Sequence, residues 1–259
     1  MKKIQLVLIT LTGLLFWQCQ PSTEEIQPLI AGTQLQEIKV NNKTNELFLY
    51  DANNRLVEYQ TFFDDGTNVW ESRRYTWKNN LVVRMEYWSA HAMYLSSWPT
   101  PGKPMALQNI ETYEYDTQNR LIKTNGYINE KEGLRWYELL SYDAQGRKAK
   151  KQFYSPDGQA TSTETFTYDQ QNNVTKWGSS YWTYDDRPNP YSFLNVPASF
   201  NPSWASPNNA TSNYGIDAQG TKYNTWIYEY SYDPKTNLPI TAKINMDNKA
   251  LKLLSFIYR

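Results

Sequence analysis

Aromatic and polar residues alternate over short runs along most of this chain. Tyr228, Tyr230 and Tyr232 fall on one face of an extended segment, and the residues between them are polar. Tyr113 and Tyr115 repeat this arrangement. Period-two alternation predicts strands of an antiparallel sheet that has one buried face and one face in water. Helix-forming residues do not cluster after the N-terminus, and 21 Tyr, 10 Trp and 9 Phe favour strands, so we expect an all-β fold.

A recurring turn separates the predicted strands. An aromatic residue followed by a polar one marks each copy, at Tyr50-Asp51, Trp77-Lys78, Tyr115-Asp116, Tyr142-Asp143, Tyr168-Asp169, Tyr184-Asp185 and Tyr232-Asp233. Half-way between copies lies a second turn signal, such as Asp65-Gly66 or Asp157-Gly158. Each unit is therefore predicted to be a β-hairpin, and serial hairpins form an antiparallel meander.

The residues of the turn fit a structural role. The Asp accepts hydrogen bonds from backbone N–H groups ahead of it. Asn54, Asn119 or Gly146, three residues after the Asp, is suited to the left-handed conformation that closes such a loop. The repeated Asp is thus interpreted as a turn former, because an enzyme needs one site whereas a meander needs every turn.

We expect one β-repeat domain over residues 34–259, with roughly 12–15 strands in a twisted, rolled sheet or incomplete barrel. A closed barrel or a sandwich is the alternative. Two Pro-rich insertions, residues 89–109 and 185–223, interrupt the meander, since proline excludes regular pairing inside a sheet.

The insertions supply the candidate ligand-binding residues, because long irregular loops are often functional. Trp88, Trp98, Tyr191 and Trp204, together with Phe193, could offer aromatic faces to a sugar or a peptide. The alternative, which we favour, is that these loops plug the open end of the curved sheet with a small core, since an ordered loop must bury something.

The N-terminus reads as a secretory signal over residues 1–18. Lys2 and Lys3 precede an apolar stretch, residues 4–17, that is too short to span a bilayer comfortably. The only cysteine, Cys19, follows directly, and residues 19–33 read as a polar tether that begins with it. An uncleaved anchor, or a secretion signal with an incidental cysteine, is the alternative.

This arrangement resembles a bacterial lipoprotein signal, in which the cysteine becomes the first residue and is acylated. The resemblance implies lipidation at Cys19, a membrane as partner, and an outer-membrane location. Glu24 and Glu25 resemble a surface-export signal, which favours the outer face of that membrane.

Several function classes are excluded or disfavoured by composition. One cysteine and one histidine rule out an intrachain disulfide and Cys₄ or Cys₂His₂ zinc sites. A net charge of zero disfavours nucleic acid as a partner. We find no nucleotide or metalloprotease motif and expect no cofactor, metal or catalytic residue. His91 is the only candidate base of its type, and a hydrolase using two carboxylates stays open.

Two family resemblances emerge from the repeat. "YDTQNRL" at residues 115–121 and "YDAQGR" at 142–147 resemble the YD repeats of the Rhs and teneurin superfamily. "YDDRPNPY" at 184–191 and the terminal segment 228–244 are similar to uncharacterised Gram-negative surface lipoproteins. The second resemblance implies a secreted, lipid-anchored β-sheet protein. We therefore expect a non-catalytic structural or interaction role at the cell surface, with a glycan or a surface protein as partner. A carbohydrate-binding accessory protein of a glycan-uptake system is the alternative.

Overall fold

The computed structural model describes residues 33–90, 101–129, 131–197, 202–247 and 249–259, and these form sixteen strands and two short helices. The strands are β1 Leu35–Val40, β2 Lys43–Tyr50, β3 Leu56–Phe62, β4 Val69–Lys78, β5 Leu81–Ser89, β6 Ala106–Tyr115, β7 Leu121–Tyr127, β8 Leu134–Tyr142, β9 Lys148–Tyr154, β10 Ala160–Tyr168, β11 Val174–Trp177, β12 Ser180–Pro188, β13 Asn208–Ile216, β14 Lys222–Tyr232, β15 Pro239–Met246 and β16 Lys249–Tyr258. The helices are η1, a 3₁₀ helix at Pro190–Leu194, and α1 at Pro202–Ala205.

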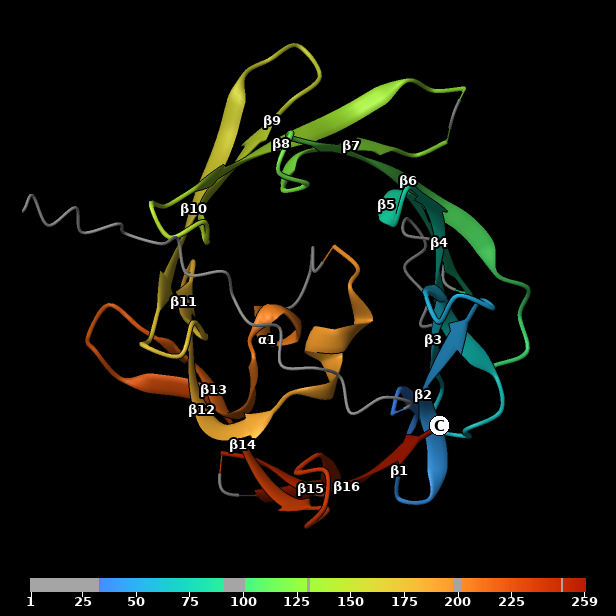
Figure 1. Ribbon diagram of the computed structural model, residues 1–259, viewed down its shortest axis with the longest axis vertical. Coiled ribbons are helices and arrows are strands. Elements are labelled where there is room, and N and C mark those ends of the chain that lie inside the picture. Colours follow the sequence, from blue (N-terminus) through green and yellow to red (C-terminus); the bar gives the residue numbers. More distant parts are fainter. Residues whose placement is uncertain (1–32, 91–100, 130, 198–201, 248) are drawn as a thin grey trace, which may run out of the picture.

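The strands form one antiparallel meander that closes into a barrel. Each strand pairs with its neighbours in sequence, and β1 pairs with β16 to complete the ring (Figure 1). The all-β antiparallel meander predicted from the repeat is confirmed, and the sheet closes, which was the alternative to an open roll. The sixteen described strands exceed the expected number, partly because residues 208–216, inside the segment expected to be irregular, form β13.

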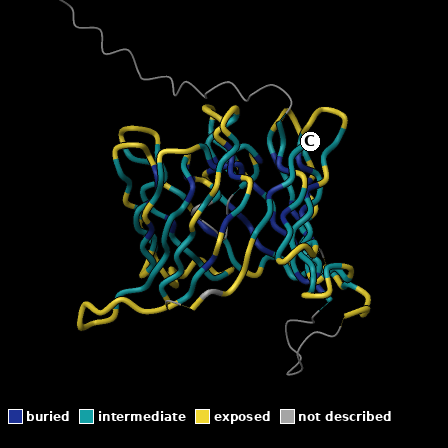
Figure 2. The backbone as a smooth tube through the Cα atoms, turned by 90° about the horizontal axis from the view of Figure 1, so that it is seen from below, coloured by how far each residue is buried: buried dark blue, intermediate teal, exposed yellow. Residues whose placement is uncertain are grey.

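Alternation along many strands places apolar side chains inside and charged side chains outside, although Glu111 and Glu138 are buried and Leu139 and Ile240 are exposed. Met85 is 1% exposed in the core, and its neighbours Arg84 and Glu86 form an ion pair of 3.0 Å on the outer face. Outward pairs of this kind are Lys39–Glu37, Arg74–Glu58, Arg84–Glu86 and Lys123–Glu114. Buried residues lie between the two ends of the barrel, whose turns are exposed (Figure 2).

The helices η1 and α1 lie inside the ring of strands (Figure 1) and are called the plug below. Leu194 of η1 is 4% exposed and belongs to a core cluster with Ile38, Phe48 and Leu56 of the wall. The barrel interior is thus filled on the side of β1–β3 by a segment of the same chain. Within the described residues, no helix has the length and apolar character needed to cross a membrane.

The turns at Asp51, Asp116, Asp143, Asp169 and Asp233 are held by their aspartates, as predicted. The prediction of a turn at Tyr184-Asp185 is wrong, because both residues lie inside β12. Asp116 Oδ1 accepts the backbone N–H groups of Gln118 and Arg120, both at 2.9 Å. Its Oδ2 accepts the Arg120 side chain at 2.7 Å. These bonds favour the charged carboxylate and hold the pKa of Asp116 below its ordinary value, the backbone bond from Arg120 most of all. Asn119 adopts the left-handed conformation, with φ of 61°.

The aromatic residue of most turns donates a hydrogen bond to an earlier strand, whereas Tyr232 donates to the Asp185 carboxylate. The Tyr142 hydroxyl donates to the Leu121 carbonyl at 2.7 Å, and the Arg120 guanidinium lies 4.7 Å from the Tyr142 ring centroid. Equivalent bonds run from Tyr50 to Leu35, Trp77 to Leu56, Tyr115 to Val82, Tyr168 to Lys148, Tyr184 to Val174 and Tyr258 to Pro239. Each acceptor is at or next to the start of a strand. We call the end of the barrel that carries these turns the YD end.

The last residue closes this series. The Arg259 guanidinium lies 4.5 Å from the Tyr50 ring centroid, as the turn arginines lie over the next aromatic ring. Arg259 also exchanges two backbone hydrogen bonds with Gln34, at 3.1 and 2.9 Å. Arg259 thus makes with Tyr50 the cation–π contact that the turn arginines make with the next aromatic ring.

Candidate binding pocket between the plug and the barrel wall

The motif "NPY" begins the plug and fixes where it leaves the wall. The Asn189 side chain accepts the Tyr191 N–H at 3.1 Å and donates to the Ser206 carbonyl at 2.9 Å. The Asn189 N–H donates to the Pro207 carbonyl at 2.8 Å. Asn189 therefore caps η1 and connects the start of the plug to the residues that follow α1. Pro190 suits the first helical position because its missing N–H is not needed there.

Aromatic rings hold the plug against the wall. Tyr191 stacks on Trp204 with centroids 5.0 Å apart, and Trp204 meets the edge of Tyr59 at 5.1 Å. Glu46 accepts hydrogen bonds from Tyr59 at 3.0 Å and from Tyr191 at 3.1 Å. Burial under the plug raises the pKa of Glu46, while the two tyrosine hydroxyls act in the opposite direction. The wall and the plug therefore share one carboxylate and one aromatic cluster.

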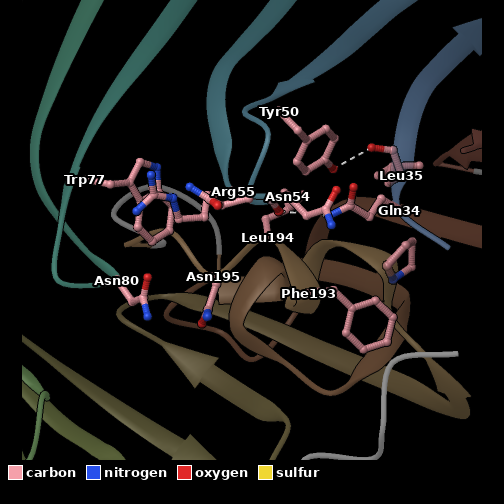
Figure 3. Close-up of a pocket in the computed structure, with 12 residues that line it drawn as sticks. Gln34, Leu35, Tyr50, Asn54, Arg55, Trp77, Asn80, Phe193, Leu194 and Asn195 are labelled. Atoms are coloured by element: carbon pink, nitrogen blue, oxygen red, sulfur yellow. Dashed lines mark hydrogen bonds between the residues drawn. The ribbon is translucent and has the colours of Figure 1, made fainter. Parts of the chain in front are cut away.

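A cavity of about 390 Å³ lies at the YD end, between η1 and the turns that follow β2 and β4. Phe193, Leu194 and Asn195 lie across the cavity from Tyr50, Arg55, Trp77 and Asn80 (Figure 3). The full lining is Gln34, Leu35, Tyr50, Asn53, Asn54, Arg55, Trp77, Asn80, Pro190, Phe193, Leu194 and Asn195. Four asparagines and one glutamine thus converge on three aromatic side chains.

The asparagines are placed by backbone geometry. Asn54, Asn80 and Asn195 have φ values of 60°, 60° and 58°, in the left-handed region that asparagine tolerates better than most residues. Arg55 is the only charged residue of the lining. It pairs with Asp51 at 2.7 Å and lies 5.6 Å from the Trp77 ring centroid. The lining is therefore rich in amide groups and its one guanidinium is paired, while the Arg259 guanidinium lies behind it and donates to Gln34 and Asn54.

The candidate residues taken from the sequence lie in different places. Tyr191 and Trp204 are inside the plug cluster, and Phe193 lines the pocket. Trp88 is on the outer face of β5, where its Nε1 donates to Glu86 at 3.1 Å and Arg74 covers its ring at 4.9 Å. Residues 1–32, with Cys19, and residues 91–100, with His91 and Trp98, lie outside the described residues.

The main pocket residues were not singled out from the sequence. Asn54 was interpreted as a turn former, and Trp77 as one copy of the repeated aromatic. Asn80 and Asn195 belong to segments far apart in the chain, which only the inserted plug brings to one cavity. The asparagines of the turns could have indicated this site, but their left-handed backbone conformation was already a sufficient reason for asparagine there.

Buried charges occupy another part of the inner wall. Glu111 is 0% exposed, and its Oε2 accepts the Tyr113 hydroxyl at 2.7 Å. Burial raises the pKa of Glu111 to about 7. Glu138 is 4% exposed and pairs with Lys151 at 3.6 Å. Within the described part of the chain, no three His, Cys, Asp or Glu side chains gather as metal ligands do.

A solved porin-like structure shares this fold. A porin-like protein from Bacteroides uniformis is similar with a TM-score of 0.50 and 11% identity, over 88% of this chain and 95% of that one. A porin-like protein from Bacteroides vulgatus gives a TM-score of 0.42 at 12% identity, over 88% and 99%. The structure of TcdB2-TccC3 gives a TM-score of 0.32 at 13% identity, over 87% of this chain and 13% of that one.

At these identities the likeness concerns the fold alone. The sequence matches no protein-family model and no curated protein. The fold and the pocket define the class: a closed antiparallel β-barrel with an internal plug and an amide-lined cavity at the YD end.

Proposed function

We propose that this protein is a lipid-anchored module of the bacterial cell surface with a non-catalytic structural or interaction role. In this proposal Cys19 provides the attachment to the outer membrane, and the barrel stands in water beside the bilayer. The porin-like likeness supports an outer-membrane-type or surface setting only through the fold. The pattern of residues on the wall supports a tethered barrel over an inserted one.

The polar outer wall is the observation that carries the proposal. Transmembrane barrels present an apolar band about 25 Å tall to the lipid and keep polar residues inside. Here ion pairs such as Arg84–Glu86 and Lys123–Glu114 lie outside, beside exposed apolar residues such as Leu139. Phe48 and Met85 lie inside. Charged side chains at lipid-facing positions cost several kcal/mol at the bilayer midplane, on the order of 2–4 for Arg or Lys. A water-facing barrel avoids this cost.

The non-catalytic part of the proposal rests on how the acids are used. Asp51, Asp116 and Asp143 each accept backbone and arginine hydrogen bonds within their own turns. Glu111 and Glu138, which a two-carboxylate hydrolase would need to present to substrate and water, are covered by protein. This favours scaffolding over catalysis.

Acylation and surface exposure test the proposal. Intact-mass measurement of the protein from its native membrane is expected to show the mass of a chain that begins at Cys19 and carries acyl groups. A membrane-impermeant amine reagent applied to whole cells is expected to label lysines of the outer wall, such as Lys39. An unacylated mass, or labelling only after the cells are broken, would contradict the proposal.

A second candidate function is carbohydrate binding, as an accessory protein of glycan uptake. The amide-lined pocket with an aromatic wall favours it. The proposed ligand site differs from the aromatic set expected from the sequence, since among the described members of that set only Phe193 lines the cavity.

A further inference from the structure

We propose that the cavity at the YD end binds one ring of a neutral saccharide, with Phe193 beneath the ring and the amides of Asn80 and Asn195 at its hydroxyl groups. The inference deepens the second candidate function and rests on it. It does not depend on lipid attachment.

The charge of the lining selects an uncharged ligand. The twelve lining residues include no Asp, Glu, Lys or His. The one guanidinium, that of Arg55, is held by Asp51 through two hydrogen bonds of 2.8 and 2.7 Å. A phosphate or carboxylate entering the cavity would compete with Asp51 for that guanidinium, and a cationic ligand would find no carboxylate in the lining. A neutral polar ligand neither competes with Asp51 for the guanidinium nor needs a carboxylate partner.

Three amide side chains are available to such a ligand. The side chains of Asn53, Asn80 and Asn195 form no hydrogen bond with any residue that the structure describes. Each amide offers both a donor and an acceptor, and a sugar hydroxyl is likewise a donor and an acceptor. Sites that combine a few placed polar groups with an apolar surface are the usual form of small-molecule pockets.

Phe193 supplies the apolar surface. Its ring pairs with no other aromatic ring among the described residues, unlike Tyr191 and Trp204 of the same plug. It projects from η1 at the edge of the cavity (Figure 3). The C–H face of a sugar ring suits such a surface, because burying it removes apolar area from water. The cavity of about 390 Å³ is near the lower end of the range of about 300–1,000 Å³ for ligand pockets, which favours one ring over a long chain.

Left-handed asparagines give variants that remove the amide and keep the fold. Asn80 ends the two-residue turn between β4 and β5, and glycine adopts its φ of 60° without strain. Asn42 ends the corresponding turn between β1 and β2, with φ of 66°, and does not line the pocket. Asn80→Gly and Asn42→Gly therefore make the same chemical change in matched turns, inside and outside the site.

The experiment is calorimetric titration of the full-length protein in a zwitterionic detergent, because sugar-based detergents would compete. The probes are maltotriose, cellotriose and N,N′-diacetylchitobiose, with digalacturonate as the anionic comparison and a neutral tripeptide as the peptide comparison. At least one neutral saccharide is expected to bind. Loss of one hydrogen bond in Asn80→Gly is expected to weaken its Kd about fivefold. Phe193→Ala is expected to weaken it at least as much, and Asn42→Gly to leave it unchanged.

Absence of binding by all three saccharides overturns the inference. So does binding that Asn80→Gly and Phe193→Ala leave unchanged, or tighter binding of digalacturonate or the tripeptide. Acylation and surface labelling are measured separately. Sugar binding by a protein that proves unacylated would therefore contradict only the surface anchor, and acylation without sugar binding would contradict only the pocket.

Discussion

At the scale of single residues, the repeated Tyr-Asp pair has two distinct functions. The aspartate folds its own turn, whereas the tyrosine reaches an earlier strand. Tyr142 and Leu121 show this, because a hydroxyl on the last residue of β8 binds the first carbonyl of β7. The aspartate therefore acts locally, and the tyrosine determines how successive hairpins are arranged around the barrel.

Tyr142→Phe is expected to lower the free energy of unfolding by about 1 kcal/mol, since it removes the bond to the Leu121 carbonyl and little else. Tyr137→Phe is the matched control on the same strand. Its ring stacks on Tyr154, and its hydroxyl has no hydrogen-bond partner among the described residues. Urea unfolding followed by tryptophan fluorescence measures both. Equal effects of the two substitutions would contradict the role given to the repeated tyrosine.

Glu111 is expected to make the stability of the barrel pH-dependent. Burial raises its pKa from 4.5 to about 7 in the folded protein. The folded state therefore holds this proton to higher pH than the unfolded chain does, so the contribution is favourable in acid and is lost as pH rises from about 4.5 to 7. A raised pKa of this size corresponds to about 3 kcal/mol.

Glu111→Gln keeps the shape and removes the titration. The stability of this variant relative to the unmodified protein is expected to increase between about pH 5 and about pH 8, because only the unmodified protein must bury a carboxylate at the higher pH. Urea unfolding at both pH values gives this difference. A difference that does not change with pH would show that Glu111 does not titrate in this range.

At the scale of elements, the plug is both part of the core and one wall of the pocket. Tyr191 and Trp204 attach it to β2 and β3, and its far side, from Phe193 to Asn195, faces the cavity. The sequence predicted a small core in this insertion, because its prolines and aromatics had to be buried to stay ordered. The residues Tyr191 and Trp204, taken as candidate ligand contacts, make up that core.

Trp204→Ala is expected to destabilise the protein by about 3 kcal/mol, the lower part of the range for a large aromatic residue, because Trp204 is only partly buried. Trp70→Ala is the control. Trp70 is 36% exposed and stacks only on Phe63 among the described rings, so its loss is expected to cost less than about 1 kcal/mol. Chemical denaturation compares the two, and a smaller effect of Trp204→Ala than of Trp70→Ala would contradict the role of the plug.

At the scale of the whole molecule, the sequence predicted the strands and turns, because local patterns of residues determine them. The alternation of Tyr228, Tyr230 and Tyr232 and the turn at Asp116 are local, and both were read correctly. Closure was left open because it depends on β1 pairing with β16 and on Arg259 reaching Tyr50, contacts between the two ends of the chain. The pocket could not be predicted for the same reason.

The distribution of charged and apolar side chains over the barrel wall bears on how the barrel lies relative to the membrane. A likeness to porin-like folds leaves open whether the barrel is inserted in lipid or stands in water. The alternation around Met85 supports the proposed water-facing barrel, because Met85 is buried inside while Arg84 and Glu86 pair outside. In the proposed function Cys19 provides the attachment to the membrane, so the anchor and the barrel are expected to be separable.

Fractionation of cells that produce Cys19→Ala measures this separation directly, with the unmodified protein as comparison. The unmodified protein is expected to stay with the membranes after an alkaline carbonate wash and to require detergent for release. Cys19→Ala is expected to appear folded in the aqueous fraction, because the polar wall has no affinity for the hydrocarbon core of the bilayer. Folded Cys19→Ala that still required detergent would show that the barrel itself is inserted, and would contradict the account.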